Sequence, residues 1–477
     1  MNLYKVYIDL TYLLEGRRER LIMCGIVGVS HHKQASQMAF LGLFALQHRG
    51  EEAAGIVSYD GKDAHVMKKV GLAVDNFDEE SISRLKGHVA IAHTRYSTTG
   101  SSHLKNIQPI LVTHRKKPIA VAHNGNLTNT EELYLRLEEE GSIFQTSMDS
   151  EIFVHLLAKS PNGELKQWMV NVLSQVQGAY AVIFLVEDYL IGARDPQGFR
   201  PLCLGKLGDG YILASESCAF DLMKAEFIRE IEPGEVVVIK GNKLESIYLP
   251  EARKAKRASC IFENIYFARP DSNIFSDNIY EVRKRLGAQL AKEYPANADF
   301  VMGIPDSGMY AALGYAQEMN LPFEVGMIRN HYIGRTFIQP SQFLREFRVR
   351  VKLNPIRDLI KGKKVIVVED SIVRGTTSRN RIEEIREAGA KEIHMRISCP
   401  PIVSPCFFGI DFPSNKELIA YNKTVKEIAD YIKVDSLGYL SLEGMLSVMR
   451  DKGFCTGCFT GKYPVEIPKN TDKLKLE

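Results

Sequence analysis

Long apolar runs and charge of one sign are both missing from this chain of 477 residues. Its longest uninterrupted apolar stretches, such as 181–186, have the length of a core strand, whereas a membrane helix needs about 20 residues. The net charge is only +3 with 25% charged residues and no basic tract, so nothing argues for nucleic acid or an anionic membrane as a partner. With 45% hydrophobic residues, the composition predicts a cytoplasmic protein of roughly two to three domains.

A disulfide framework is also missing. Eight cysteines in a cytosolic chain of this length do not indicate one. Cys455 and Cys458 form a C-x-x-C pair, and that spacing alone leaves open a redox pair, half of a metal site or no special role. Cys203, Cys218 and Cys399 match no motif and are interpreted as structural thiols.

The segment 365–377, VIVVEDSIVRGTT, is the most informative part of the chain. Its first four residues are apolar and β-branched, as expected of a strand covered on both faces of a parallel sheet. Glu369 and Asp370 follow at the carboxyl end of that strand, where open α/β sheets bind ligands. A loop of hydroxyl residues with Gly375 then leads into a predicted helix that ends near Gly389.

This order of elements suits a phosphorylated sugar. Free N–H groups and the positive end of the helix dipole hold phosphate, while carboxylates take sugar hydroxyls or a hydrated Mg²⁺. An ordinary capped turn is the alternative, but two adjacent buried acids are costly without a partner. The segment resembles the phosphoribosyl pyrophosphate loop of type I phosphoribosyltransferases, especially its form in amidophosphoribosyltransferases. The resemblance implies that phosphoribosyl pyrophosphate contacts Ser371, Arg374, Gly375, Thr376 and Thr377, and that Glu369 and Asp370 hold Mg²⁺. The family usually has Asp-Asp where this chain has Glu-Asp, a pair that related phosphoribosyltransferases use, so the expected activity is unchanged.

Two further segments resemble parts of the same transferases. The stretch 300–308, FVMGIPDSG, repeats the strand-then-loop pattern and is similar to their pyrophosphate loop, in which Ser307 would share the metal with the acid pair. A Pro-Asp-Ser-Gly turn on its own is ordinary turn chemistry. The polar stretch 328–345 resembles their flap, with Arg329, His331 and Arg335 available for pyrophosphate oxygens. Such a lid is needed because the reacting carbon would otherwise meet water.

Near the other end of the chain, 23–28 reads MCGIVG and resembles the start of an N-terminal-nucleophile glutamine amidotransferase. In that family Cys24 would become the first residue. Its free α-amine, with an ordinary pKa of about 7.7 to 8, could then act as the base for its own thiol. A small buried cysteine at a strand start is the alternative for this motif alone.

Four more segments match the same amidotransferases in the same order. Segment 47–56 (QHRGEEAAGI) resembles the part that closes over the glutamine pocket. Arg95 has the planar guanidinium that suits an α-carboxylate, and the resemblance assigns it to glutamine. Asn124 and Gly125, expected in a tight turn after a strand, would form the oxyanion hole, and Asp149, expected at a helix start, would bind the α-ammonium. Singly, these residues also fit a surface charge, a hairpin turn and a helix N-cap.

The first 22 residues have no such match. A charged cluster follows their apolar part, which is the reverse of a secretory signal, and no small-residue cleavage site is present. They are either a propeptide or untranslated codons ahead of a true initiator at Met23. We favour the second interpretation, because a methionine directly before Cys24 is what initiator removal requires.

Three cysteine segments, 259–263, 404–409 and 454–462, resemble the ligand segments of the iron-sulfur subgroup of amidophosphoribosyltransferases. The resemblance implies a 4Fe-4S cluster held by Cys260, Cys406, Cys455 and Cys458. From the residues alone, a tetrahedral zinc site fits equally well.

The expected fold is α+β followed by α/β. Residues 37–47 read as a buried helix, Thr128 with Glu131 as a capping box, and 180–186, 189–193, 211–214 and 236–239 as strands. The resemblance implies a leader in 1–23, an αββα-sandwich glutaminase in 24–250, and a type I phosphoribosyltransferase with a parallel sheet and a C-terminal metal-ligand segment in 251–477. A polar linker is expected over 251–259.

The function that the resemblance implies is synthesis of phosphoribosylamine from glutamine and phosphoribosyl pyrophosphate, the committing step of purine synthesis. It also implies Mg²⁺, purine nucleotides as feedback inhibitors and a homotetramer. A non-catalytic phosphoribosyl-pyrophosphate sensor is the alternative, but it has no use for Cys24, Arg95 and Asn124.

Overall fold

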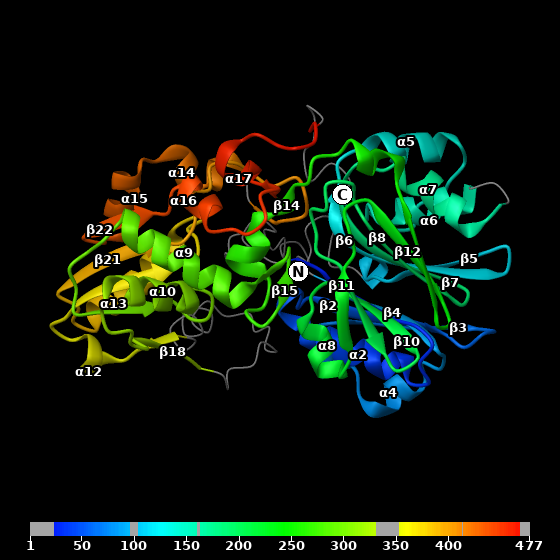
Figure 1. Cartoon of the computed structure of the whole chain (residues 1–477), viewed down its shortest axis with the longest axis horizontal. Helices are drawn as coiled ribbons and strands as arrows, with labels where there is room; N and C mark the ends of the chain where they lie inside the picture. Colours follow the sequence, from blue (N-terminus) through cyan, green and yellow to red (C-terminus); the bar gives the residue numbers. More distant parts are fainter. Residues whose placement is uncertain (1–22, 96–103, 160–162, 331–352, 413, 468–477) are drawn as a thin grey trace, which may run out of the picture.

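The computed structural model describes residues 23–95, 104–159, 163–330, 353–412 and 414–467. Two parts lie side by side in Figure 1, a sandwich of two sheets (residues 25–248) on the right and a parallel-sheet part (residues 259–460) on the left. Within the described ranges, no helix has both the length and the apolar character that crossing a membrane requires.

The sandwich consists of two antiparallel sheets. The first has the strand order β11-β9-β10-β1-β4-β2-β3 and the second β13-β12-β8-β7-β6-β5. The strands of the first sheet are β1 (Gly25–Val29), β2 (Ala53–Tyr59), β3 (Ala64–Val70), β4 (Val89–Arg95), β9 (Cys203–Leu207), β10 (Gly210–Ala214) and β11 (Glu226–Glu230). Those of the second are β5 (Ile110–His114), β6 (Lys117–Leu127), β7 (Gly178–Val186), β8 (Tyr189–Arg194), β12 (Glu235–Lys240) and β13 (Lys243–Tyr248).

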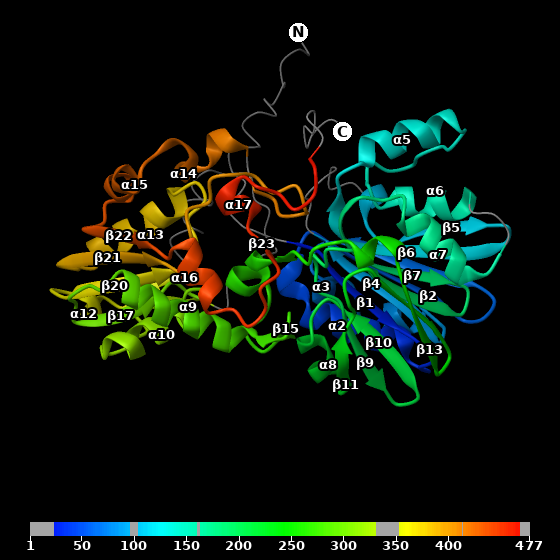
Figure 2. The ribbon, with the colours of Figure 1, turned by 45° about the horizontal axis from the view of Figure 1, so that its top comes forward.

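Helices cover the outer face of each sheet (Figure 2). One outer layer contains α2 (Ala35–Ala45), α3 (Ala73–Asn76), α4 (Glu79–Ser83) and α8 (Cys218–Met223), and the other α5 (Thr130–Glu139), α6 (Glu151–Lys159) and α7 (Leu165–Leu173). Three apolar cores fill the spaces between these four layers, and the middle core lies between the two sheets. Strands such as β1 and β7 are buried on both faces, which explains why they read as continuous apolar runs.

The second part is built on a parallel sheet of order β17-β20-β21-β22. Its strands are β17 (Phe300–Gly303), β20 (Lys364–Glu369), β21 (Glu392–Ile397) and β22 (Ser436–Tyr439). The helices are α9 (Ile279–Glu293), α10 (Met309–Met319), α12 (Arg357–Ile360), α13 (Thr376–Glu387), α14 (Ile419–Asn422), α15 (Val425–Ile432), α16 (Leu442–Ser447) and α17 (Gly457–Thr460). Short strand pairs join β14 (Ser259–Cys260) to β23 (Phe454–Cys455), β15 (Asn273–Ile274) to β16 (Asp277–Asn278), and β18 (Met327–Arg329) to β19 (Leu353–Pro355).

The predicted fold class, an αββα sandwich followed by a parallel sheet, is confirmed. The predicted strands fall within β7, β8, β10 and β12, and the first predicted helix is α2. The Thr128–Glu131 capping box is wrong, because Asn129 is the N-cap of α5 and makes no side-chain cap bond. The tight turn at Asn124 and Gly125 is also wrong. Both residues lie inside β6, where they pair with Ala181 and Tyr180 of β7.

Candidate functional site

Cys24 lies directly before β1, at one end of the first sheet. Gly25 pairs with Thr94 of β4, so Cys24 lies next to the strand end that carries Arg95. The Cys24 side chain is partly exposed, and its carbonyl accepts a hydrogen bond of 3.0 Å from Nε of the buried Arg49. A thiol at this position can be reached by a small molecule while its backbone is held from within the protein.

Asn124 and Gly125 lie in β6 of the facing sheet. Asn124 is only 1% exposed, and its Nδ2 has no hydrogen-bond partner among the described residues. Gly125 has φ +153°, and a Cβ there would lie 2.0 Å from the carbonyl oxygen of Ala179, so only glycine fits. A buried amide without a partner is costly, so this donor is suited to an oxygen that arrives with a ligand.

Asp149 lies two residues before α6 and contacts the end of β6. Its carboxylate accepts hydrogen bonds from the Leu127 N–H at 3.0 Å and the Ser150 hydroxyl at 3.2 Å. Burial alone would raise the pKa of Asp149, but the nearby His123 and these hydrogen bonds hold that pKa below its ordinary value. The site therefore offers an ionised carboxylate, which is what an α-ammonium group needs.

Arg95 is linked to the same region through Asn106. The Arg95 guanidinium is 2% exposed and donates to the Asn106 carbonyl. The Asn106 side chain in turn contacts the Ser147 hydroxyl at 3.1 Å and accepts from the Ser147 N–H at 3.3 Å. The structure thus connects Arg95 with the segment that carries Asp149.

Three buried polar residues of this region were missed by the sequence analysis. The His123 ring contacts the Ser150 hydroxyl at 3.0 Å, and Gln108 both accepts from the His123 N–H at 2.7 Å and donates to Ser150 at 3.0 Å. These contacts fix the strand around Asn124 to the segment around Asp149. Their only sequence signal was that His123 and Ser150 directly adjoin matched residues.

The second group of residues lies at the carboxyl ends of β17 and β20. These strands are parallel neighbours, so the loops that follow them meet at one edge of the sheet. Asp370 accepts hydrogen bonds of 2.5 Å from both the Ser307 and the Ser371 hydroxyl groups. Burial raises the pKa of Asp370 above its ordinary value, although these hydroxyls oppose the shift. A cation beside it would restore the charged form.

Glu369 points in another direction from Asp370. Its carboxylate accepts from the Ser378 hydroxyl at 2.9 Å and from Arg381 at 2.5 Å, both on α13. This carboxylate therefore fastens β20 to α13, while Asp370 and Ser307 face each other across the two loops.

The loop after β20 ends at the N-terminus of α13. Gly375 adopts φ +81° as the N-cap, and the helix begins at Thr376, followed by Thr377. N–H groups in the first turn of a helix point out of its end, and together with the dipole they favour a phosphate. Arg374 lies on the loop and forms an ion pair of 2.6 Å with Glu417. Such half-exposed pairs contribute little, about 0–1 kcal/mol, so an anion can compete for this guanidinium.

Arg329 is the one predicted flap residue within the described ranges. It lies at the end of β18 and forms an ion pair with Asp306 of the pyrophosphate-like loop. His331 and Arg335 lie outside the described residues.

The four cysteines of the expected cluster lie in one neighbourhood. Cys260 and Cys455 are register partners on the parallel strands β14 and β23. The Cys458 carbonyl accepts hydrogen bonds from the Val403 N–H at 2.9 Å and the Ser404 N–H at 3.0 Å, so Cys458 lies beside the segment that carries Cys406. Burial raises the pKa of Cys458 well above its ordinary value, and the thiols of Cys455, Cys406, Cys260 and Cys399 raise it further. Burial likewise raises the pKa of Cys260 to about 11, with Cys406 contributing.

This donor set suits a soft metal, because thiolates are soft ligands and a cation stabilises the thiolate form. The thiols are not yet close enough to coordinate one ion. In the described ranges, no three His, Cys, Asp or Glu side chains are arranged to hold a metal ion. The residues fit a metal by chemistry and proximity, and their side chains would have to close around it.

The segment after Cys406 lies against the strand that carries Asn124. The Asn126 side chain donates to the Phe407 carbonyl at 3.0 Å, and a Cβ on Gly409 would lie 2.9 Å from the Gly125 carbonyl. Phe408 stacks on Phe199 of the sandwich with ring centroids 4.2 Å apart. The cysteine neighbourhood and the Asn124 strand are therefore in direct contact.

Comparisons with known proteins match both parts. Residues 93–221 match the family model described as a glutamine amidotransferase domain, and residues 272–428 match that of a phosphoribosyl transferase domain. An amidophosphoribosyltransferase of Archaeoglobus fulgidus is 48% identical over 456 residues, covering 94% of this chain and 99% of the relative. One of Bacillus subtilis is 47% identical over 455 residues, covering 94% of this chain and 95% of the relative.

A solved structure gives the same match in three dimensions. The glutamine phosphoribosylpyrophosphate amidotransferase from B. subtilis, complexed with ADP and GMP, superimposes with a TM-score of 0.89 at 46% identity. The match covers 95% of this chain and 100% of that structure.

Proposed function

This chain belongs to the amidophosphoribosyltransferase family, and from that premise we propose that the two groups of residues described above are its two active sites. The reaction of the family is the first step of purine biosynthesis. Glutamine, phosphoribosyl pyrophosphate and water give phosphoribosylamine, glutamate and pyrophosphate. Residues 24–250 would form the glutaminase and residues 251–477 the transferase, with 1–23 as a leader.

In the glutaminase site, Cys24 is the nucleophile. Its Sγ attacks the side-chain carbonyl carbon of glutamine, and the free α-amine carries the thiol proton to the departing nitrogen, so that ammonia leaves and a thioester remains. Water then cleaves the thioester, which releases glutamate. The chemistry requires Cys24 to be the first residue, because an amide nitrogen is not a base.

The observation that carries this assignment is the buried amide of Asn124, whose Nδ2 has no hydrogen-bond partner in the part of the chain that the structure describes. As the thiol attacks, the carbonyl oxygen becomes an anion, and Asn124 Nδ2 with the Gly125 N–H supplies donors that need no rearrangement. Arg95 would hold the α-carboxylate and Asp149 the α-ammonium of glutamine, so binding fixes the reacting amide in place.

In the transferase site, ammonia attacks C1 of phosphoribosyl pyrophosphate while the bond from C1 to the pyrophosphate oxygen breaks. Asp370 and Ser307, with Glu369 behind them, would hold Mg²⁺, which when bound neutralises charge on the leaving pyrophosphate. Ser371, Arg374, Gly375, Thr376 and Thr377 would hold the 5-phosphate and ribose, and Arg329, His331 and Arg335 the pyrophosphate.

We assign the chain to the iron-sulfur subgroup, with a 4Fe-4S cluster on Cys260, Cys406, Cys455 and Cys458. Three buried cysteines and the partly exposed Cys455 come together from three distant segments, which supports a metal. When bound, a cluster would tie these segments together and so stabilise the transferase part. Zinc remains the competing metal, because thiolates suit both.

For feedback inhibition and subunit assembly, we propose the properties that the family resemblance implies. The B. subtilis relative was solved with ADP and GMP, which supports purine nucleotides as feedback inhibitors of this chain. We also propose a homotetramer, because the family resemblance implies one, and a cytoplasmic location. The competing function is a sensor of phosphoribosyl pyrophosphate without activity. It would not explain why the buried Asn124 amide has no partner within the described ranges.

Replacing the nucleophile tests the two-site assignment. Cys24→Ala should abolish synthesis from glutamine and leave synthesis from ammonium salts largely intact, because ammonia enters after the glutaminase step. Cys203→Ala is the matched control, since this buried thiol of β9 lies in the sandwich core and should be replaceable in both assays. Equal loss of both activities in Cys24→Ala would contradict the assignment.

A further inference from the structure

Arg49 is a buried arginine that touches the backbone of the nucleophile. It ends the short 3₁₀ helix η1 (Gln47–Arg49), and its side chain is fully buried. Its Nε donates to the Cys24 carbonyl at 3.0 Å. The orientation of this guanidinium therefore decides where the Cys24 carbonyl is held.

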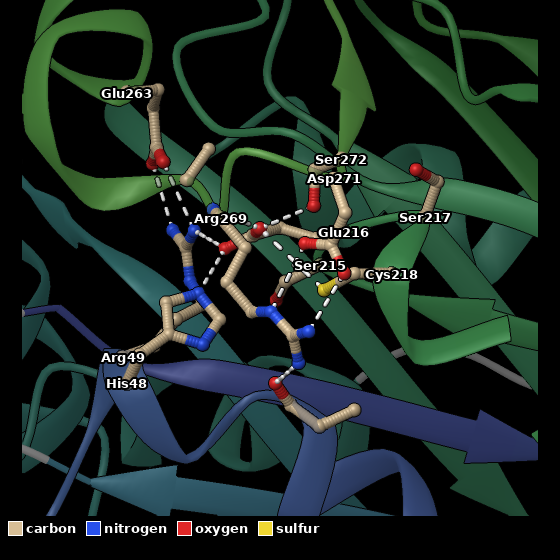
Figure 3. A network of polar contacts seen from close by, with 12 residues as sticks. His48, Arg49, Ser215, Glu216, Ser217, Cys218, Glu263, Arg269, Asp271 and Ser272 are labelled. Carbon is tan, nitrogen blue, oxygen red and sulfur yellow. Dashed lines mark hydrogen bonds and ion pairs between the residues drawn. The ribbon is translucent and has the colours of Figure 1, made fainter. Parts of the chain in front are cut away.

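Two buried glutamates fix that guanidinium (Figure 3). Glu263 accepts from it in a bidentate manner, at 2.8 and 3.0 Å, and Glu216 accepts from Nη1 at 2.5 Å. Both carboxylates have no exposed side-chain surface. A bidentate pair fixes the guanidinium plane as well as its position, and with that plane fixed the direction of the Nε–H bond is fixed too.

The two glutamates come from different parts of the molecule. Glu216 follows β10 in the sandwich, and its second oxygen accepts from the Arg269 N–H at 2.8 Å and the Ser272 hydroxyl at 2.6 Å. Glu263 begins the π-helical turn η4 (Glu263–Phe267), three residues after Cys260. Arg49 is thus held by one glutamate of the sandwich and by one glutamate of the parallel-sheet part.

The turn that carries Glu263 is itself fastened to the transferase part. Arg283 of α9 is buried and donates to the Asn264 carbonyl at 3.0 Å and the Ala268 carbonyl at 2.8 Å. A second buried arginine, Arg200, lies 3.5 Å from the Glu263 carboxylate. Two buried arginines thus face the two buried glutamates, and the partly exposed His48 ring contacts Glu216 at 2.7 Å.

We propose that Glu263 is a positioning residue for the glutaminase, acting through Arg49 on the carbonyl of Cys24. The carbonyl, the thiol and the α-amine belong to one residue, so a rotation of the Cys24 backbone moves the nucleophile and its base together. The transferase part thereby sets the attack geometry in the other active site. This inference rests on the proposed role of Cys24, and it assigns no contact between Glu263 and glutamine.

The test is Glu263→Gln, which keeps the shape and replaces one acceptor oxygen with a donor. A misplacement of about 1 Å can cost about 10²-fold in rate, so kcat with glutamine should fall roughly 10- to 100-fold. The KM for glutamine should change less than about threefold, because Arg95 and Asp149 remain in place, and synthesis from ammonium salts should stay near the wild-type rate. A merely structural defect would lower both activities.

Glu235→Gln is the matched control. Glu235 is also a fully buried carboxylate paired with an arginine, Arg229 at 2.6 Å, but it lies on β12 and makes no contact with Arg49 in the described ranges. Its variant should leave the ratio of glutamine-dependent to ammonia-dependent kcat unchanged. If Glu263→Gln shifts this ratio no more than Glu235→Gln does, the proposal is wrong.

A double-mutant cycle tests whether Glu263 acts on Cys24 through Arg49. In an Arg49→Lys background, Glu263→Gln should add less than about threefold to the loss in glutamine-dependent kcat, because the link is already broken. Fully additive losses would show that Glu263 acts by another route and would overturn the inference. Cys24→Ala is run in parallel, since synthesis from glutamine by that variant would refute the proposed function rather than the positioning role.

Discussion

Asn124→Ala should lower the glutamine-dependent activity while leaving the stability of the protein nearly unchanged. If the Asn124 amide is the donor to the oxyanion, its removal should lower glutamine-dependent kcat by about 10²–10³, equivalent to about 2.7–4 kcal/mol. The ammonia-dependent rate should not change, because no oxyanion forms in that reaction.

The structure predicts that Asn124→Ala will change the free energy of unfolding only slightly. Asn124 Nδ2 is buried without a partner among the described residues, and such a donor costs about 1–3 kcal/mol. Alanine removes that cost but also removes packing contacts, so the free energy of unfolding should change by less than about 1 kcal/mol. Unfolding in urea measures it, and glutamate release with phosphoribosylamine formation measures the two activities.

Asn129→Ala provides the opposite pattern as a control. The Asn129 side chain donates to the Gln175 carbonyl and accepts from the Gln177 N–H, both at 2.9 Å. Its loss leaves both groups without their partner, so stability should fall by about 1–3 kcal/mol while glutamine-dependent kcat changes little. The reasoning is refuted if Asn124→Ala keeps its glutamine-dependent rate, or loses both activities together.

Three further predictions concern the transferase part. Asp370→Asn should raise the KM for phosphoribosyl pyrophosphate with either nitrogen donor, because Asp370 joins the two phosphate loops, and a selective loss of glutamine hydrolysis would contradict this. Gly409→Ala should lower glutamine-dependent kcat selectively, since its Cβ would press on Gly125, whereas Gly208→Ala, also at positive φ but with open space around it, should not. Anaerobically purified protein should be brown, with about four iron and four sulfide per chain, and a colourless, fully active protein with one zinc would refute the cluster.

The transferase loop could be predicted from the sequence because its signals are local. A buried strand, two acids, a glycine and an amphipathic helix follow one another within a short stretch, and the structure contains them as β20, Gly375 and α13. Gly389 ends that helix region at φ +97°, as the sequence indicated.

One failed prediction and one contact that the sequence did not indicate both depend on distant partners. Asn-Gly is a strong local turn signal, yet Asn124 and Gly125 stay extended because β7 supplies a partner for the whole of β6. The ion pair of Arg49 with Glu263 joins residues 214 positions apart, and nothing near either residue indicates which buried charge it meets. Local patterns predict the elements, whereas tertiary pairing decides how the side chains on them are held.

The contact of Phe407 and Gly409 with the Asn124 strand has a consequence for the order of synthesis. Asn126 and Phe407 are 281 residues apart, and at about 5–20 residues per second the ribosome needs roughly 14–56 seconds to make the stretch between them. During that time the sandwich can fold while the strand that carries Asn124 still lacks its contacts with Phe407 and Gly409. Under the proposed role of Asn124, a nascent chain would complete its glutaminase site only when its transferase part is nearly finished.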